Sequence, residues 1–108
     1  EIELYNISQR AMSGNPKAMC EFGSMYKRKG FWVVQSEKDA IEWWLKSAEM
    51  GYAPCQFAMG ALYLIGEEGV ENDMSKAKFW LYKAKESTYK KYAKASAELY
   101  ATYELDKY

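Results

Sequence analysis

The chain has 108 residues, enough for one compact domain or a short array of repeats. Its 15 basic and 15 acidic residues give a formal net charge of zero, which argues against a nucleic-acid-binding protein, since such proteins usually carry a basic excess. No apolar run approaches the ~18 residues that a membrane-spanning helix needs, and no signal-peptide pattern is found. The sequence begins at Glu1 without a methionine, which is consistent with a fragment of a longer protein, so the compartment is left open.

The predicted elements follow a period of 37 residues. A shift of this size superposes eight identical pairs, most of them glycine, alanine or aromatic residues. The pairs are Gly14/Gly51, Gly23/Gly60, Tyr26/Tyr63, Val33/Val70, Ala40/Ala77, Trp43/Trp80, Lys46/Lys83 and Glu49/Glu86. A fixed period of this length is typical of a repeat array. We therefore divide the chain into a half repeat (1–13), two whole repeats (14–50 and 51–87) and a second half repeat (88–108).

Each whole repeat is predicted to hold two helices, which we call helix A and helix B. In the first repeat, apolar residues recur at helical spacing after Pro16, which is well tolerated in a first turn. A second set with the same spacing predicts helix B; its members are Ala40, Trp43, Trp44, Ser47 and Ala48. Residues 1–13 then correspond to a helix B, and residues 88–108 to a helix A or a capping helix.

The turn between the two helices carries its own signals. Gly66 and Gly69 are expected to end helix A because glycine tolerates left-handed backbone angles, and Val70 is expected to pack the turn. Asp73 is predicted to cap the next helix B. In the first repeat, Ser36 followed by Asp39 predicts a capping box instead.

Gly23 and Gly60 fall in the middle of the predicted A helices, where glycine costs ~1 kcal/mol relative to alanine. Close approach of the two helices of a repeat would offset that cost, with Trp43 or Trp80 covering the glycine. Together these features predict an all-α fold, an α/α solenoid of stacked antiparallel helix pairs.

Three segments carry a resemblance to a known family: "AMCEFGSMY", "KDAIEWWLKSAEMG" and "GVENDMSKAKFWLYKA". They resemble the Sel-one-like repeat (SLR) family, a relative of the tetratricopeptide repeats. The positions that match its pattern are Ala18, Phe22–Gly23, Tyr26, Met59–Gly60, Tyr63, Gly69–Val70, Asp73, Lys76–Ala77 and Trp80. The first repeat departs from the pattern at Phe31, Trp32 and Ser36, and the last half repeat at Tyr92 and Ala97.

The resemblance implies a protein–protein interaction module, an adaptor or scaffold without catalysis of its own. Bacterial members serve in secretion, envelope signalling, host interaction or toxin neutralisation, and eukaryotic members in quality control of the endoplasmic reticulum. A secretion-associated or toxin-neutralising bacterial protein is therefore one specific expectation. The alternative is a structural segment that self-associates end to end, unless Ile2, Leu4, Tyr103 and Tyr108 cap its ends; light scattering would separate the two, and a monomer is expected. An enzyme is the third interpretation.

By analogy with tetratricopeptide repeats, a partner would bind the concave side, which the A helices line. The corresponding positions are Lys17, Ser24, Lys27, Arg28, Phe57, Ala61, Leu64, Ile65, Lys91 and Lys94. An apolar centre flanked by lysine and arginine predicts a partner segment with hydrophobic anchors and acidic residues. An interpretation of equal weight is that Phe57, Leu64 and Ile65 only pack between neighbouring helices.

Two further features allow a functional and a structural interpretation. Phe31 and Trp32 are a secondary interface candidate, since Trp is enriched among interface hot spots. The favoured interpretation is that they fold back over the helix pair or cap the end of the array. The stretch "YKKYAKASAELY" places lysines between aromatic residues, as single-stranded nucleic-acid binders do. The neutral total charge favours a capping helix with solvated lysines instead, so no nucleic acid is expected as a partner.

Catalytic and metal-binding signatures are missing from the sequence. It contains no histidine, and two cysteines cannot form a structural zinc site without further ligands. We therefore expect no catalytic residue, no metal and no cofactor. Cys20 and Cys55 lie on neighbouring predicted A helices, whose axes would be ~8–10 Å apart. A disulfide would need Cα atoms within ~7 Å, so free, partly buried thiols are the favoured expectation.

Overall fold

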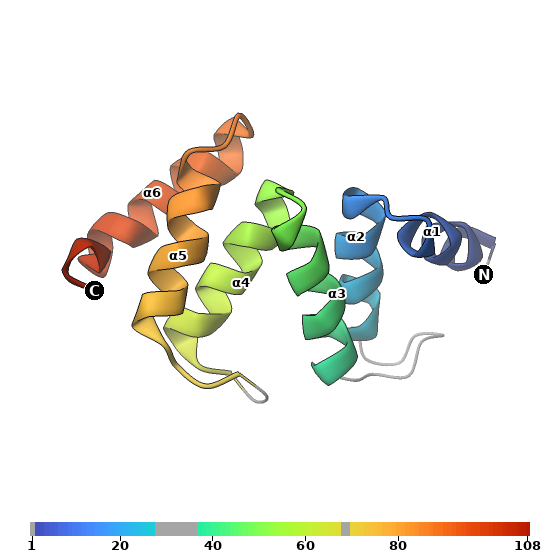
Figure 1. Ribbon diagram of the computed structural model, residues 1–108, viewed down its shortest axis with the longest axis horizontal. Coiled ribbons are helices and arrows are strands. Elements are labelled where there is room, and N and C mark those ends of the chain that lie inside the picture. The colour runs from blue at the N-terminus through green and yellow to red at the C-terminus, as the bar shows by residue number, and fades with distance from the viewer. Residues whose placement is uncertain (1, 28–36, 68–69) are drawn as a thin grey trace.

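The computed structural model describes residues 2–27, 37–67 and 70–108, and Figure 1 shows them as a row of helices. The described helices are α1 (Ile2–Met12), α2 (Pro16–Lys27), α3 (Glu37–Glu49), α4 (Ala53–Ile65), α5 (Met74–Lys85) and α6 (Lys90–Thr102), followed by the 3₁₀ helix η1 (Leu105–Lys107). The described residues form no strand. The molecule measures 45 × 29 × 18 Å, and its two termini lie at opposite ends. The prediction of an all-α solenoid of antiparallel helix pairs is therefore confirmed.

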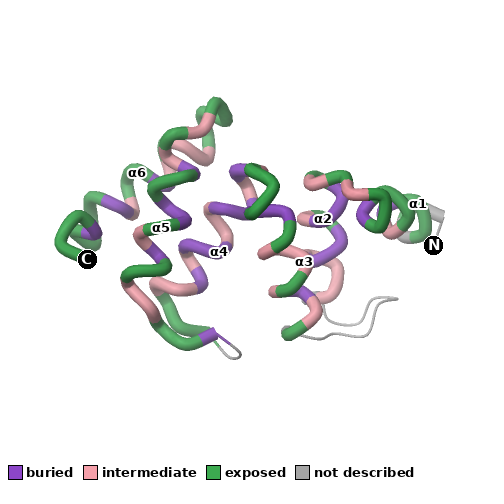
Figure 2. The backbone as a smooth tube through the Cα atoms, in the orientation of Figure 1, coloured by how far each residue is buried: buried purple, intermediate pink, exposed green. Residues whose placement is uncertain are grey.

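The core is distributed along the solenoid in three clusters. The first joins α1 to α2 through Ile7, Ala11 and Phe22. The second is centred on Met59 and Trp80 in the middle of the chain, and the third lies beneath α5, α6 and η1. Figure 2 shows the buried positions on the sides where neighbouring helices face each other. The two helices of each repeat thus pack on each other and on the adjacent repeats, as in other solenoids.

Helix α4 ends at the glycine that the sequence indicated. Gly66 has a φ of 73°, in the left-handed region, and its N–H donates to the Leu62 carbonyl at 2.8 Å. Val70 is buried at 8% exposure and packs the turn, as expected. Asp73 caps α5, where its side chain accepts a hydrogen bond from the Lys76 N–H at 3.0 Å. Gly69 and Ser36 lie outside the described residues.

Close helix approach at the mid-helix glycines is also confirmed, but the covering residue is not the one predicted. A Cβ atom on Gly23 would lie 2.7 Å from Cδ1 of Trp44, and one on Gly60 would lie 2.5 Å from Cγ of Leu81. Helix B therefore presents the residue after each predicted tryptophan to the glycine. Trp43 instead makes an edge-to-face contact with Phe22, with ring centroids 5.3 Å apart.

Candidate protein-binding surface

The candidate positions on α4 differ in how far they are available to a partner. Phe57 and Leu64 pack against the cluster formed by Leu81, Tyr100 and Leu105, and both are only partly exposed. Ile65, at the end of α4, remains 67% exposed. The two interpretations of the apolar centre therefore apply to different residues: Phe57 and Leu64 contribute to the packing between helices, whereas Ile65 presents most of its surface to solvent.

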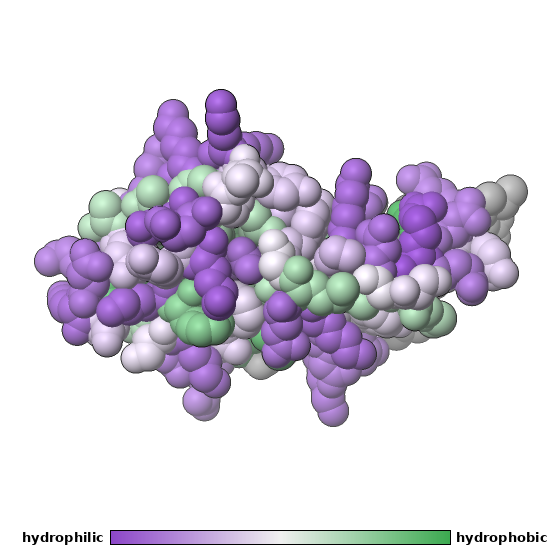
Figure 3. All heavy atoms as spheres, turned by 45° about the horizontal axis from the view of Figure 1, so that its top comes forward, coloured by the Kyte–Doolittle hydropathy of each residue, from purple (hydrophilic) through white to green (hydrophobic). Residues whose placement is uncertain are grey.

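Exposed lysines flank this apolar centre on the neighbouring A helices. Lys17 is exposed in the first turn of α2, and Lys91 and Lys94 are exposed on α6. The ammonium of Lys91 lies 5.6 Å from the centre of the Tyr92 ring, and that ring lies 5.9 Å from the Phe57 ring. Tyr92 of α6 thus lies between the Lys91 ammonium and the Phe57 ring of α4. Figure 3 shows hydrophobic patches separated by hydrophilic side chains over one face of the molecule.

Ser24 has internal hydrogen bonds rather than a freely available hydroxyl. Its Oγ donates to the Cys20 carbonyl at 3.0 Å and accepts from Nε1 of Trp44 at 3.2 Å. The same indole N–H also reaches the Cys20 carbonyl, at 3.0 Å. Ser24 therefore helps to hold the Trp44 side chain against α2. Arg28, Phe31, Trp32 and the side chain of Lys27 lie outside the described residues.

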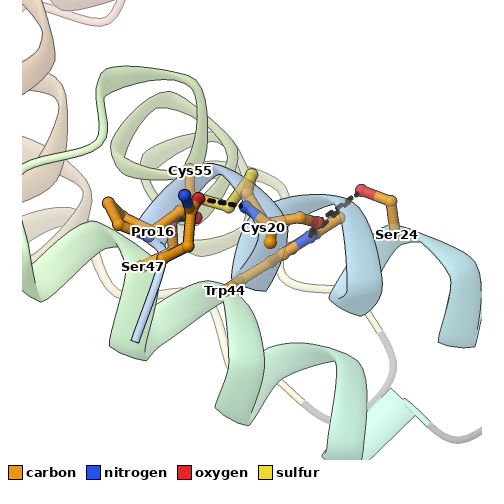
Figure 4. The surroundings of a disulfide bond; sticks show 8 residues. Pro16, Cys20, Ser24, Trp44, Ser47 and Cys55 are labelled. Carbon is orange, nitrogen blue, oxygen red and sulfur yellow. Dashed lines mark hydrogen bonds between the residues drawn. A yellow bond between two sulfur atoms is a disulfide. The ribbon is translucent and has the colours of Figure 1, made fainter. Parts of the chain in front are cut away.

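The expectation of free thiols is wrong: a disulfide joins Cys20 of α2 to Cys55 of α4 (Figure 4). The S–S distance is 2.08 Å and the Cα atoms are 5.9 Å apart, within the range that a disulfide needs. The expectation of free thiols assumed that the axes of α2 and α4 stay a constant distance apart along their length. In the structure this distance changes. The two helices approach at the start of α4, which directly follows the tight turn after α3, and diverge from there (Figure 1).

A hydrogen bond fixes the α3–α4 turn next to this disulfide. Ser47, fully buried near the end of α3, donates from its Oγ to the Pro16 carbonyl at 2.6 Å. The end of α3 is thereby held against the start of α2. This places the first turn of α4, with Cys55, beside Cys20 (Figure 4).

Helix α5 carries exposed aromatic residues that were not among the interface positions expected from the sequence. Phe79 and Tyr82 are 53% and 50% exposed, and both lie near the buried Tyr100 of α6. Aromatic residues one turn apart on a helix are the signal that could have identified them. Their neighbour Tyr100 is 7% exposed. Burial raises the pKa of its hydroxyl, and so does the hydrogen bond that this hydroxyl donates to the Asp106 carboxylate.

A raised pKa at Tyr100 makes the folded protein sensitive to alkaline pH. The folded state favours the neutral phenol, so this stabilisation is complete below the ordinary tyrosine pKa of about 10 and is lost as the pH rises through the folded-state pKa. Urea unfolding between pH 8 and 11 should show a smaller loss of stability for Tyr100→Phe than for the wild type. Burial also raises the pKa of Tyr52, so part of the alkaline loss should remain. A Tyr103→Phe control tests a matched exposed position; equal pH slopes in wild type and Tyr100→Phe would contradict the prediction.

Among the residues that the structure describes, no group of three or more His, Cys, Asp or Glu side chains is placed to hold a metal ion. Within the same part of the chain, no helix is both long enough and apolar enough to cross a membrane.

The stacked helix pairs and their equivalent glycine contacts define an α/α solenoid built from helix-pair repeats. The chain belongs to the Sel1 repeat family, whose profile matches residues 16–52 and 53–89. No curated protein sequence matches it at a significant level.

Two solved bacterial structures are similar to this chain. One is c5321, described as a protective antigen present in uropathogenic Escherichia coli strains displaying an SLR fold, with a TM-score of 0.68 and 36% identity. The other is a Sel1 repeat protein from Oxalobacter formigenes, with a TM-score of 0.70 and 29% identity. The matches cover 75% and 76% of this chain but only 17% and 60% of those chains, so the chain spans less than two thirds of either relative. Sel1 repeats generally act as non-catalytic protein–protein interaction modules.

Proposed function

We propose that this chain is an adaptor or scaffold that binds a segment of another protein on the concave face lined by α2, α4 and α6. The observation that carries the proposal is the exposure of Ile65, a large aliphatic side chain that is 67% exposed, on a helix flanked by lysine-bearing A helices. The exposed lysines Lys17, Lys91 and Lys94 lie near the starts of α2 and α6, at the opposite end of the A helices from Ile65. A partner segment that runs along this face would combine a hydrophobic anchor on Ile65 with acidic residues near the lysines.

A narrower form of the proposal rests on the family resemblance, and the bacterial origin of the two similar structures agrees with its bacterial part. In that form the chain is a bacterial adaptor, associated with secretion or with toxin neutralisation, and it acts as a monomer. The division into a half repeat, two whole repeats and a half repeat is part of the same proposal, in which the second half repeat adds α6 and its lysines to the A-helix face.

Replacement of Ile65 by serine should weaken partner binding at least tenfold while the helical circular dichroism signal and melting temperature stay close to wild type. Ile65 is mostly exposed, so its loss removes little buried surface in the free protein. The measurement is isothermal titration of the partner recovered by affinity capture and mass spectrometry. Met50→Ser, at a 53% exposed residue in the α3–α4 turn, is the matched control.

The choice of Ile65 rather than Leu64 separates binding from folding. Leu64 packs against the α5–α6 cluster, so Leu64→Ser is expected to lower stability as well as binding. If Ile65→Ser and Met50→Ser bind the partner as tightly as the wild type, the A-helix face is not the binding surface. Unfolding of Ile65→Ser would instead assign this side chain to packing.

A further inference from the structure

The Cys20–Cys55 disulfide crosses the boundary between the two whole repeats. Within each repeat the two helices meet closely at a glycine: α2 meets α3 at Gly23, and α4 meets α5 at Gly60. This close packing makes each helix pair a stiff unit. The boundary between the two units includes the packing of α3 on α4, the short α3–α4 turn and the disulfide from α2 to α4. The disulfide is therefore placed to control how the two helix pairs are oriented.

The next boundary connects its A helices at the same two positions without a covalent bond. Phe57 and Tyr92 stand 37 residues after Cys20 and Cys55. Their rings are in contact, with centroids 5.9 Å apart, and they join α4 to α6. Both boundaries thus use this pair of positions to connect successive A helices. A reductant breaks the connection at the first boundary and leaves the connection at the second intact.

The two cysteines differ in their exposure to solvent. Cys55 is fully buried, whereas Cys20 is partly exposed. The thiolate of a low-molecular-weight thiol can attack the Cys20 sulfur, which breaks the S–S bond, and Cys55 leaves as a thiolate that takes up a proton. A second small thiolate then attacks the mixed disulfide on Cys20 and releases this cysteine, which is also protonated. Two electrons and two protons thus pass to the protein, and the two small thiols leave as one disulfide.

The hydrogen bonds next to the disulfide do not involve its sulfur atoms. Ser47 donates to the Pro16 carbonyl at 2.6 Å, which holds the end of α3 on α2. The side-chain amide of Gln56 donates to the Ala48 carbonyl at 3.2 Å, which holds the first turn of α4 at the end of α3. After reduction the α3–α4 turn therefore remains attached to both helix pairs and can act as a hinge. The disulfide is the second attachment that fixes the angle between α2 and α4.

We propose that the oxidation state of Cys20 and Cys55 controls the shape of the A-helix face and, through it, the affinity for the partner segment. This inference rests on the proposed function. In the oxidised protein, Lys17 at the start of α2 and Ile65 at the end of α4 are presented at one fixed separation. After reduction the two helix pairs rotate about the α3–α4 turn, and only a fraction of the molecules keeps that separation. The apparent Kd then rises by the inverse of this fraction.

The geometric test measures the distance between α2 and α4 in the absence of a partner. Lys17→p-acetylphenylalanine and Ile65→p-acetylphenylalanine provide ketone groups for nitroxide labels, so both cysteines stay unlabelled. Pulsed electron paramagnetic resonance should give a narrow distance distribution for the oxidised protein. After reduction, anaerobic removal of the reductant and labelling, the distribution should be at least twice as wide. Cys20→Ala/Cys55→Ala should give the wide distribution with or without reductant.

A second label pair and a helicity measurement define the contrary results. Labels at Ile65 and Lys94 span the α4–α6 boundary, and reduction should leave their distance distribution unchanged. The inference is overturned if the Lys17–Ile65 distribution is the same in both redox states, or if both label pairs broaden equally. Loss of the helical circular dichroism signal on reduction would also overturn it, because the bond would then be required for folding.

The binding test separates this inference from the proposed function. Peptides are selected on the oxidised chain from a random peptide display library, and those whose binding Ile65→Ser weakens are kept as probes. In fluorescence anisotropy, the reduced protein should bind these probes at least fivefold more weakly than the oxidised protein does. Equal affinities would overturn the inference and leave the proposed function standing. If no selected peptide depends on Ile65, the proposed function fails at this face, and the redox control of affinity fails with it.

Discussion

Gly60→Ala should lower the free energy of unfolding by about 2 kcal/mol, although alanine is the better helix former. The added Cβ would lie 2.5 Å from Cγ and 2.7 Å from Cδ2 of Leu81, which is itself fully buried. Overpacking of this kind costs about 1–3 kcal/mol and occasionally more. The intrinsic helix preference of alanine returns only about 1 kcal/mol. Urea denaturation, together with a fall in melting temperature of roughly 10 °C, would measure the effect.

A double-mutant cycle with Leu81→Ala identifies the cause. Leu81→Ala alone should cost about 2–5 kcal/mol because it leaves a cavity. In the double variant the methyl group of Ala at position 60 partly fills that cavity, so the combined loss should be smaller than the sum of the single losses. Gly23→Ala should behave like Gly60→Ala, since its Cβ would lie 2.7 Å from Cδ1 of Trp44. Strict additivity, or a Gly60→Ala protein more stable than the wild type, would refute the close-approach explanation.

The glycine contacts also show what the sequence could predict about the fold. The period of 37 residues identified the helix pairs, and glycine inside an apolar helix indicated close approach. The identity of the covering residue required the crossing geometry of the two helices. Trp43 and Trp80 match each other in type, whereas Trp44 and Leu81, which actually meet the glycines, do not. The match between the two tryptophans therefore pointed to the position just before the residue that covers each glycine.

The candidate site was less predictable, for physical reasons that differ between residues. Spacing placed Phe57, Leu64 and Ile65 on α4, but it could not divide them into packed and exposed side chains, because that depends on how closely α6 approaches. Ser24 was at a position compatible with binding, yet its hydroxyl is engaged by Trp44 from 20 residues away. The aromatic face of α5 was missed because its counterparts in the preceding repeat, Glu42 and Leu45, have different chemistry.

Removal of the Cys20–Cys55 disulfide should lower the free energy of unfolding by about 4 kcal/mol. The bond closes a loop with a sequence separation of 35 residues. By the chain-entropy treatment, such a cross-link stabilises the folded state mainly by restricting the unfolded chain. It also ties α2 to α4 across the boundary between two repeats, so its loss should make the two repeats unfold less cooperatively. In a reducing compartment the same chain would lack this stabilisation.

The measurement compares guanidinium unfolding of the oxidised wild type, the reduced wild type and Cys20→Ala/Cys55→Ala. The reduced wild type should have a lower midpoint than the oxidised wild type, the double variant should have a midpoint slightly below that of the reduced wild type, and reductant should leave the double variant unchanged. Because Cys55 is fully buried, a small part of the loss in the double variant will come from the missing sulfur atoms, and the reduced wild type isolates the cross-link itself. Alkylation under denaturing conditions without reductant should label no cysteine. Labelling of both cysteines, or equal midpoints with and without reductant, would show that the bond between the two repeats does not form in solution.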